Sequence, residues 1–184
     1  MEATAVLIDE HRAIKKMLRV AENVAARLDG GEHVPAEDLA AIVEFIAGFA
    51  DKCHHAKEEG LLFPAMEKAG IPRQGGPIGV MFHEHKEGRE FVRRMRSAVG
   101  RYSAGDVRAA SEFAVNAGGY AALLRRHIDK EDNVLYPMAD NVISESGQRD
   151  LIRAFENVEE ESVGAGEHER FRQILDRLEA AYLR

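Results

Sequence analysis

The chain carries the same His-x-x-x-Glu motif twice, and this repeat limits what the chain can fold into more than any other feature. The first copy runs from His54 to Pro64 and the second from His127 to Pro137. In register, both copies read His, then Lys-Glu-acid, then Leu-aromatic-Pro, and equivalent residues are 73 positions apart. A His and a Glu four residues apart lie on one face of an α-helix, one turn from each other. An imidazole and a carboxylate so placed can hold one metal ion.

A fainter repeat precedes each motif. Glu10-His11-Arg12 matches Glu84-His85-Lys86, 74 positions further along the chain. The chain therefore consists of two copies of one unit, a helix with a single His followed by a helix with His-x-x-x-Glu. Together the copies supply six candidate metal ligands: His11, His54, Glu58, His85, His127 and Glu131.

Apolar residues recur at steps of three and four along most of the chain, which is typical of helices that bury one face. This spacing predicts long helices at about 4–29, 35–68, 77–102 and 106–140, a short helix near 148–159 and a last amphipathic helix that ends at Leu183. No segment reads as a strand. Long helices joined by short links favour an all-α fold, an up-down-up-down four-helix bundle with a C-terminal helical extension.

That topology brings the candidate ligands together. His11 and His85 come early in the first and third helices, whereas His54 and His127 come late in the second and fourth. Antiparallel neighbours place early and late positions at the same end of a bundle, so we expect all six side chains at one level of the core. Six polar groups buried together would be costly without a partner that satisfies them, which favours a bound metal over an ordinary core.

Other polar residues near the motifs are expected to have lesser roles. His55 follows a polar helix face and is expected at the surface or behind the ligands, and His83 on a solvated face. His33 falls in a loop, and His168 belongs to a stripe that packs the last helix. Tyr120 lies two turns before His127 and is either ordinary core or a hydrogen-bond donor near the metals.

Each His-x-x-x-Glu motif is followed by a proline. Pro64 and Pro137 have no amide proton and cannot donate to the carbonyl four residues before. We therefore expect both helices to bend or end one to two turns beyond their Glu.

Composition excludes several classes of protein. With 184 residues, 45% of them hydrophobic, the chain suits a single globular domain. A net charge of −7 argues against a nucleic-acid partner, and no apolar run reaches the roughly 18 residues of a membrane span. Charged residues near the N-terminus argue against an export signal, and a lone Cys53 fits a reducing compartment. We therefore expect a cytoplasmic protein with neither nucleic-acid nor membrane partners.

These motifs resemble those of the hemerythrin-like family, also called HHE cation-binding domains, over about residues 4–140. The resemblance implies a four-helix bundle with a non-haem di-iron centre. We expect this bundle to comprise residues 1–140, and residues 141–184, which lie outside the resemblance, to form a helical extension packed on it. It implies that His11, His54, His85 and His127 are terminal ligands. Glu58 and Glu131 would bridge two iron ions, together with an oxo or hydroxo group. Mixed imidazole and carboxylate ligands would also suit Mn or Zn.

The chain departs from oxygen-carrying hemerythrins, which have His-x-x-x-His on the third helix. Here Arg89 stands four residues after His85. Those hemerythrins also end in His-x-x-x-x-Asp, whereas the fourth helix of this chain has His-x-x-x-Glu. The pattern is more similar to iron-centre repair, nitric-oxide-responsive and iron- or oxygen-sensing members. We expect a centre that binds or reacts with O2, NO or peroxide for sensing, scavenging or detoxification. The sequence leaves open whether that makes the protein an enzyme.

Alternatives remain at this point. The site could belong to an iron donor or store for iron-centre repair, or to a structural Zn or Mn module. Residues 141–184 could cap the bundle, form a homodimer or carry a signal, and the sequence does not decide among these roles.

Overall fold

Helices account for most of the chain, as its apolar spacing predicts. The computed structural model describes residues 2–159, 164 and 166–183, and no strand occurs among them. Its α-helices are α1 (Ala3–Asp29), α2 (Ala36–Phe45), α3 (Phe63–Lys68), α4 (Pro77–Ser103), α5 (Arg108–Lys130), α6 (Tyr136–Val142), α7 (Glu145–Val158) and α8 (Glu167–Tyr182). Stretches with π-helical hydrogen bonding are η1 (Ile46–His55), η2 (Glu58–Leu62) and η3 (Glu131–Leu135). The predicted all-helical class is confirmed.

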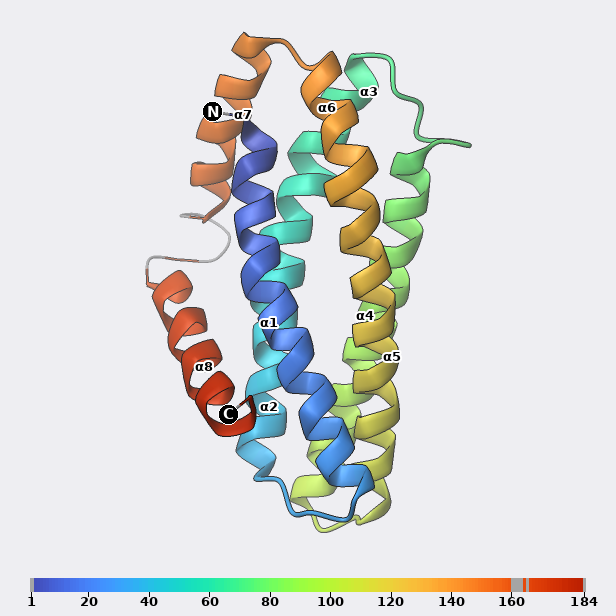
Figure 1. Cartoon of the computed structure of the whole chain (residues 1–184), viewed down its shortest axis with the longest axis vertical. Coiled ribbons are helices and arrows are strands. Elements are labelled where there is room, and N and C mark those ends of the chain that lie inside the picture. Colours follow the sequence, from blue (N-terminus) through green and yellow to red (C-terminus); the bar gives the residue numbers. More distant parts are fainter. Residues whose placement is uncertain (1, 160–163, 165, 184) are drawn as a thin grey trace.

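The long helices lie side by side along the long axis of the molecule (Figure 1). Helix α5 packs against both α1 and α4, and α2 packs against α4. The links 30–35 and 104–107 lie at one end of the molecule, and the link 69–76 lies at the other (Figure 1). None of the described helices is both long and apolar enough to span a bilayer.

Local signals in the sequence set the helix boundaries at these links. Gly31 and Gly105 follow α1 and α4 with φ of 78° and 91°, a conformation that favours glycine. Asp106 accepts a hydrogen bond from the Arg108 backbone amide at 3.0 Å, so its side chain caps the start of α5. The links are short because the helices end where these residues occur.

The proline positions coincide with widened helical turns rather than with helix ends. The amide of Phe63 donates to the Glu58 carbonyl, and the amide of Tyr136 donates to the Glu131 carbonyl, five residues back in both cases. Pro64 and Pro137 come directly after these amides. A π-turn therefore accommodates each proline, which has no amide donor, and the chain continues as α3 or α6.

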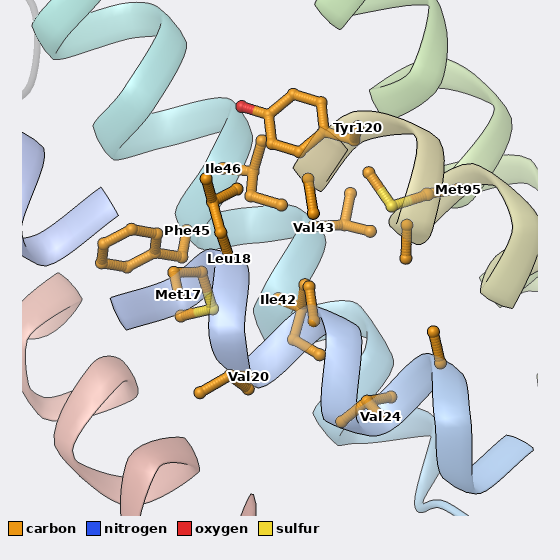
Figure 2. Packing of buried hydrophobic residues seen from close by; sticks show 14 of the residues in the cluster. Met17, Leu18, Val20, Val24, Ile42, Val43, Phe45, Ile46, Met95 and Tyr120 are labelled. Atoms are coloured by element: carbon orange, nitrogen blue, oxygen red, sulfur yellow. The ribbon is translucent and has the colours of Figure 1, made fainter. Parts of the chain in front are cut away.

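Two apolar clusters fill the interior. The larger contains residues of α1, α2, η1, α4, α5 and α8, and Figure 2 shows Met17, Ile42, Ile46, Met95 and Tyr120 packed within it. The smaller joins the start of α1 to α3, α6, the start of α4 and α7. Burial of these aliphatic and aromatic side chains is the main favourable contribution to folding.

Helices α1 and α4 each pass from one apolar cluster to the other through a short polar segment. On α1, Leu7 belongs to the smaller cluster and Ile14 to the larger, and His11 lies between them. On α4, His85 lies between Met81 and Val92 in the same way. A buried polar layer thus crosses the interior between two apolar regions.

The helices after residue 142 pack on the others. Phe171 of α8 lies edge-on to Phe45, with ring centroids 5.9 Å apart, and Tyr182 donates a hydrogen bond to Asp38 at 2.5 Å. On α7, Gln148 accepts a hydrogen bond from the Ala3 amide at 2.8 Å. Residues 160–163 and 165 of the expected extension lie outside the described residues.

The docking of α8 can be tested at Gly48. A methyl group at this position would overlap the ring of Phe171, whereas a methyl at Gly118 of α5 would meet nothing within 4 Å. We expect Gly48→Ala to lower the free energy of unfolding by about 1–3 kcal/mol through overpacking. The matched Gly118→Ala should raise it by up to about 1 kcal/mol through helix propensity. Urea denaturation of both variants measures the difference, and equal effects would contradict the packing of Phe171 on Gly48.

Candidate metal centre

The polar layer contains all six predicted ligands. Their side chains come from α1, η1, η2, α4, α5 and η3. Each is at most 1% exposed: His11, His54, Glu58, His85, His127 and Glu131. The structure therefore brings together the residues that the repeat singles out, although their role as ligands stays a prediction.

The four histidines face each other in two pairs. His11 Nε2 lies 3.0 Å from His54 Nε2, and His85 Nε2 lies 3.0 Å from His127 Nε2. Each pair joins one histidine of the fainter repeat to one of the His-x-x-x-Glu motif in the same half of the chain. Two imidazole nitrogens that converge in this way are typical of ligands that share one cation.

The two glutamates lie between the histidine pairs. Glu131 Oε2 is 3.3 Å from His11 Nε2, and Glu131 Oε1 is 3.0 Å from His127 Nε2. Glu58 Oε2 is 3.7 Å from His54 Nε2 and 3.5 Å from His85 Nε2. Each carboxylate thus contacts one histidine of each pair.

Carboxylate oxygens in this layer need a partner that the surrounding protein does not supply. Glu58 Oε2 and both side-chain oxygens of Glu131 are buried and form no well-aligned hydrogen bond with the described residues. Their nearest polar neighbours are the histidine Nε2 atoms. A buried polar atom without a partner costs about 1–3 kcal/mol, and more when it is charged. A cation between the histidine pairs would satisfy all three oxygens, so the residues present fit a metal.

The pKa values of Glu58 and Glu131 shift in opposite directions, and a bound cation would remove this difference in protonation. Burial and the neighbouring charge of Glu131 raise the pKa of Glu58 well above its ordinary value. Burial opposes ionisation of Glu131 as well, but His127 and His11 hold its pKa well below the ordinary value. Metal binding requires deprotonated ligands, so a cation would displace the proton from Glu58.

The pKa values of His54 and His127 also shift in opposite directions. Burial lowers the pKa of His54 to about 4, so this imidazole is neutral at pH 7, the form that binds a metal. Burial also lowers the pKa of His127, but Glu131 and Glu84 outweigh it and raise the value to about 9. A cation beside Glu131 would therefore take the place of the proton on His127.

Each candidate histidine also contacts a carboxylate through its second nitrogen, Nδ1. The contacts are His11 to Asp132 at 2.7 Å, His54 to Glu10 at 2.8 Å, His85 to Glu59 at 2.7 Å and His127 to Glu84 at 2.9 Å. A carboxylate at this nitrogen holds its proton there, orients the ring and leaves Nε2 for a metal. Such outer partners are the arrangement that metal-binding histidines almost always have.

A basic side chain supports each of these four acids. Lys57 contacts Glu10 at 2.5 Å, and Lys130 contacts Glu84. Lys15 contacts Asp132 and Arg89 contacts Glu59, both at 2.7 Å. These basic side chains follow the repeat, because Lys57 and Lys130 are 73 positions apart and Lys15 and Arg89 are 74 positions apart. Arg89, on the helix where oxygen-carrying hemerythrins have a second histidine, therefore holds an acid behind His85.

The expectation for His55 is wrong where it places the residue at the surface. His55 is 3% exposed, and one of its nitrogens lies with ligand atoms of Glu58, His85 and His127 within 4.8 Å of one another. The expectation assumed an α-helix, in which His54 and His55 face different directions. Both residues belong to η1, whose wider turns leave both side chains inside.

Tyr136 is a further residue of the layer that the repeat did not single out. Its hydroxyl donates to Glu58 Oε1 at 2.8 Å and lies 3.3 Å from His11 Nε2. Burial and the nearby Glu58 charge raise the pKa of this phenol well above its ordinary value, so it remains a donor. The sequence did contain a signal for this residue. The Leu-aromatic-Pro pattern places Tyr136 in register with Phe63, and only Tyr136 has a hydroxyl.

The remaining expectations can be compared directly. His83 is exposed and His33 lies in the link between α1 and α2, as predicted. The stripe of the last helix is buried at Phe171, Leu175, Leu178 and Tyr182, which confirms its packing role. Tyr120 lies in the larger apolar cluster beside Val43 and Ile46, so the core alternative holds (Figure 2).

Comparison with known families agrees with this geometry. The model of the hemerythrin HHE cation-binding domain matches residues 2–139. The chain belongs to this family. The match ends near the end of α6, so α7 and α8 lie beyond it.

Several curated proteins are similar to the chain. Uncharacterised proteins of Mycobacterium tuberculosis and Mycobacterium bovis are 28% identical over 173 residues, or 94% of the chain. The chain spans 66% of their length, just under two thirds. An iron-sulfur cluster repair protein, YtfE of Edwardsiella ictaluri, is 33% identical over 88 residues, which are 47% of the chain and 40% of that protein.

The same repair protein of Dickeya chrysanthemi is 28% identical over 137 residues, or 71% of the chain and 60% of that protein. No solved structure matches the chain.

The support of His54 by Glu10 generates a prediction. We expect Glu10→Gln to weaken metal binding by about 10- to 100-fold, because the amide holds the imidazole less firmly than the carboxylate does. The matched control is Asp9→Asn, which makes the same chemical change one residue earlier, on an exposed side chain. Competition with a chelator measures both dissociation constants, and an unchanged value for Glu10→Gln would contradict the proposed support.

Proposed function

We propose that the chain holds two iron ions in the polar layer of an up-down-up-down four-helix bundle. The bundle would comprise residues 1–140, and residues 141–184 would form an extension packed on it. In this proposal His11 and His54 bind one iron, His85 and His127 bind the other, and Glu58 and Glu131 bridge them. The position of each carboxylate between the histidine pairs is the observation that carries the proposal.

Charge balance supports a cation site in the polar layer, and the two separate histidine pairs support two cations rather than one. The two central glutamates would contribute two negative charges inside the layer. The four acids behind the histidines are already balanced by Lys15, Lys57, Arg89 and Lys130. Two divalent cations would exceed the charge of these two carboxylates by two, and an oxo group between the cations would offset that excess. Buried charges are stable only when paired.

Burial restricts what could react at such a centre. The candidate ligands are at most 1% exposed, and the layer is closed above and below by apolar clusters. Only small species fit this setting, and six protein ligands leave positions open on two iron ions. We therefore propose a cytoplasmic protein whose centre binds or reacts with O2, NO or peroxide. Its role would be sensing, scavenging or detoxification.

The protein side chains have definite tasks in this function. Iron, when bound, would supply the electron-transfer chemistry. The Tyr136 hydroxyl donates its hydrogen to Glu58, which orients that carboxylate, and its oxygen lies 3.3 Å from His11 Nε2. The four Nδ1 carboxylates keep the histidines in the tautomer that presents Nε2 to a metal. The apolar clusters keep bulk water away from the layer.

A second candidate function is the donation of iron to other proteins. The similarity to proteins named for iron-sulfur cluster repair favours it. A donor would release its metal quickly to a chelator without loss of the helical fold. A centre built for redox reactions would hold its metal and change its optical spectrum with O2, NO or peroxide. A Zn or Mn module would bind metal without such a change.

Metal analysis with an optical spectrum tests the proposal. We expect about two irons per chain after purification from iron-supplemented cells, with near-ultraviolet bands that bleach on reduction. His54→Ala and Glu131→Ala should lose most of the metal, because each removes one of the few ligands of a cation. The control His83→Ala removes an exposed histidine on α4 and should keep it. Full iron occupancy in His54→Ala, or zinc in place of iron in the native protein, would contradict the proposal.

A further inference from the structure

The two halves of the polar layer differ at two positions. Most repeat-related residues make equivalent contacts, as the pairs Lys57 and Lys130 show at Glu10 and Glu84. The second copy, however, has Ile128 where the first has His55, and Tyr136 where the first has Phe63.

Ile128 is a buried aliphatic residue of the larger apolar cluster, so the second copy supplies no imidazole equivalent to that of His55.

His55 lies on the side of the layer that contains His85 and His127. Its ring is stacked on that of His85, with centroids 3.8 Å apart and planes inclined by 16°. It is edge-on to His127 at 5.8 Å. Ligand atoms of His55, Glu58, His85 and His127 all lie within 4.8 Å of one another, so the four side chains can be grouped around one cation.

His55 also has the outer contacts that the four predicted histidine ligands have. Its Nδ1 lies 3.4 Å from Asp51 Oδ1, and the same oxygen accepts a hydrogen bond from Arg89 Nε at 2.8 Å. With Nδ1 turned to a carboxylate that a cation supports, Nε2 is the nitrogen left for a metal.

We propose that His55 is a seventh protein ligand, the third imidazole of the cation held by His85 and His127. The proposal rests on the two-cation centre proposed above. It makes the two cations unequal, because the one held by His11 and His54 has two imidazoles and the Tyr136 hydroxyl nearby instead. The sequence repeat hides this difference, since it matches His55 with Ile128.

The test is a metal titration of His55→Phe in the full chain. Phenylalanine keeps the aromatic stacking on His85 but removes both ring nitrogens. Losing an outer partner of a ligand already costs about 10- to 100-fold in affinity, so losing a ligand should cost about 100-fold or more for one of the two cations. The other cation should bind as in the native protein. The control is His83→Phe, which removes an exposed imidazole from α4.

Affinities come from anaerobic titration with Fe²⁺ against a competing chelator, after circular dichroism has shown that each variant is folded. Mössbauer spectra of the iron-loaded native protein should contain two components of equal area. His55→Gln provides a second test if the phenylalanine variant does not fold, and it should weaken the same cation.

The possible outcomes separate the two proposals. Native affinities and an unchanged spectrum in a folded His55→Phe or His55→Gln would overturn the role of His55 and leave the two-cation centre intact. A native protein that binds fewer than two cations would overturn both proposals. Loss of one cation in the His55 variants, with both retained in His83→Phe, is the result expected.

Discussion

The burial of Glu58 and Glu131 is the constraint on which the rest of the interior depends. Two carboxylates at 0% exposure, with three oxygens that form no well-aligned hydrogen bond with the described residues, could not persist in an apolar core without compensation. The histidines converge on these oxygens, acids hold the histidines, and basic side chains hold the acids. Each set of side chains supplies polar partners for the set inside it. Acidic and basic groups therefore alternate from the centre to the surface. The apolar clusters on both sides keep the layer dry and strengthen these interactions.

The widened helical turns place this layer where it can form. In η2 and η3 the wider hydrogen bonding starts at the glutamates themselves and ends just before Pro64 and Pro137. A proline in an ideal α-helix would leave a carbonyl without its donor and force a kink. Here the same residue follows a π-turn that begins at a candidate ligand, and such turns are common at functional sites. In η1 the wider turn brings His54 and His55 inside together.

The repeat also explains how one layer contains both symmetry and difference. Acids before the single histidines, Glu10 and Glu84, support a histidine of their own half. Acids after the central glutamates, Glu59 and Asp132, support a histidine of the opposite half. The halves are therefore interlocked, and neither could position its ligands alone. These contacts are common to both halves. The imidazole of His55 is added on one side of the layer and the phenol of Tyr136 on the other.

The sequence by itself determined the helices, the family and the residues that gather in the core. Helical periodicity is a local property, and a motif repeated at one offset identifies equivalent positions, so the six candidate ligands could be named before any coordinates. Only the tertiary structure decided that His55 faces inward, that Tyr136 reaches Glu58 and which acid supports which histidine. The physical reason is that π-helical turns change which side chains share a face, and ideal α-helical spacing does not reveal them. The supporting contacts, moreover, join residues up to 121 positions apart, as for His11 and Asp132. Such pairings arise only when the helices pack.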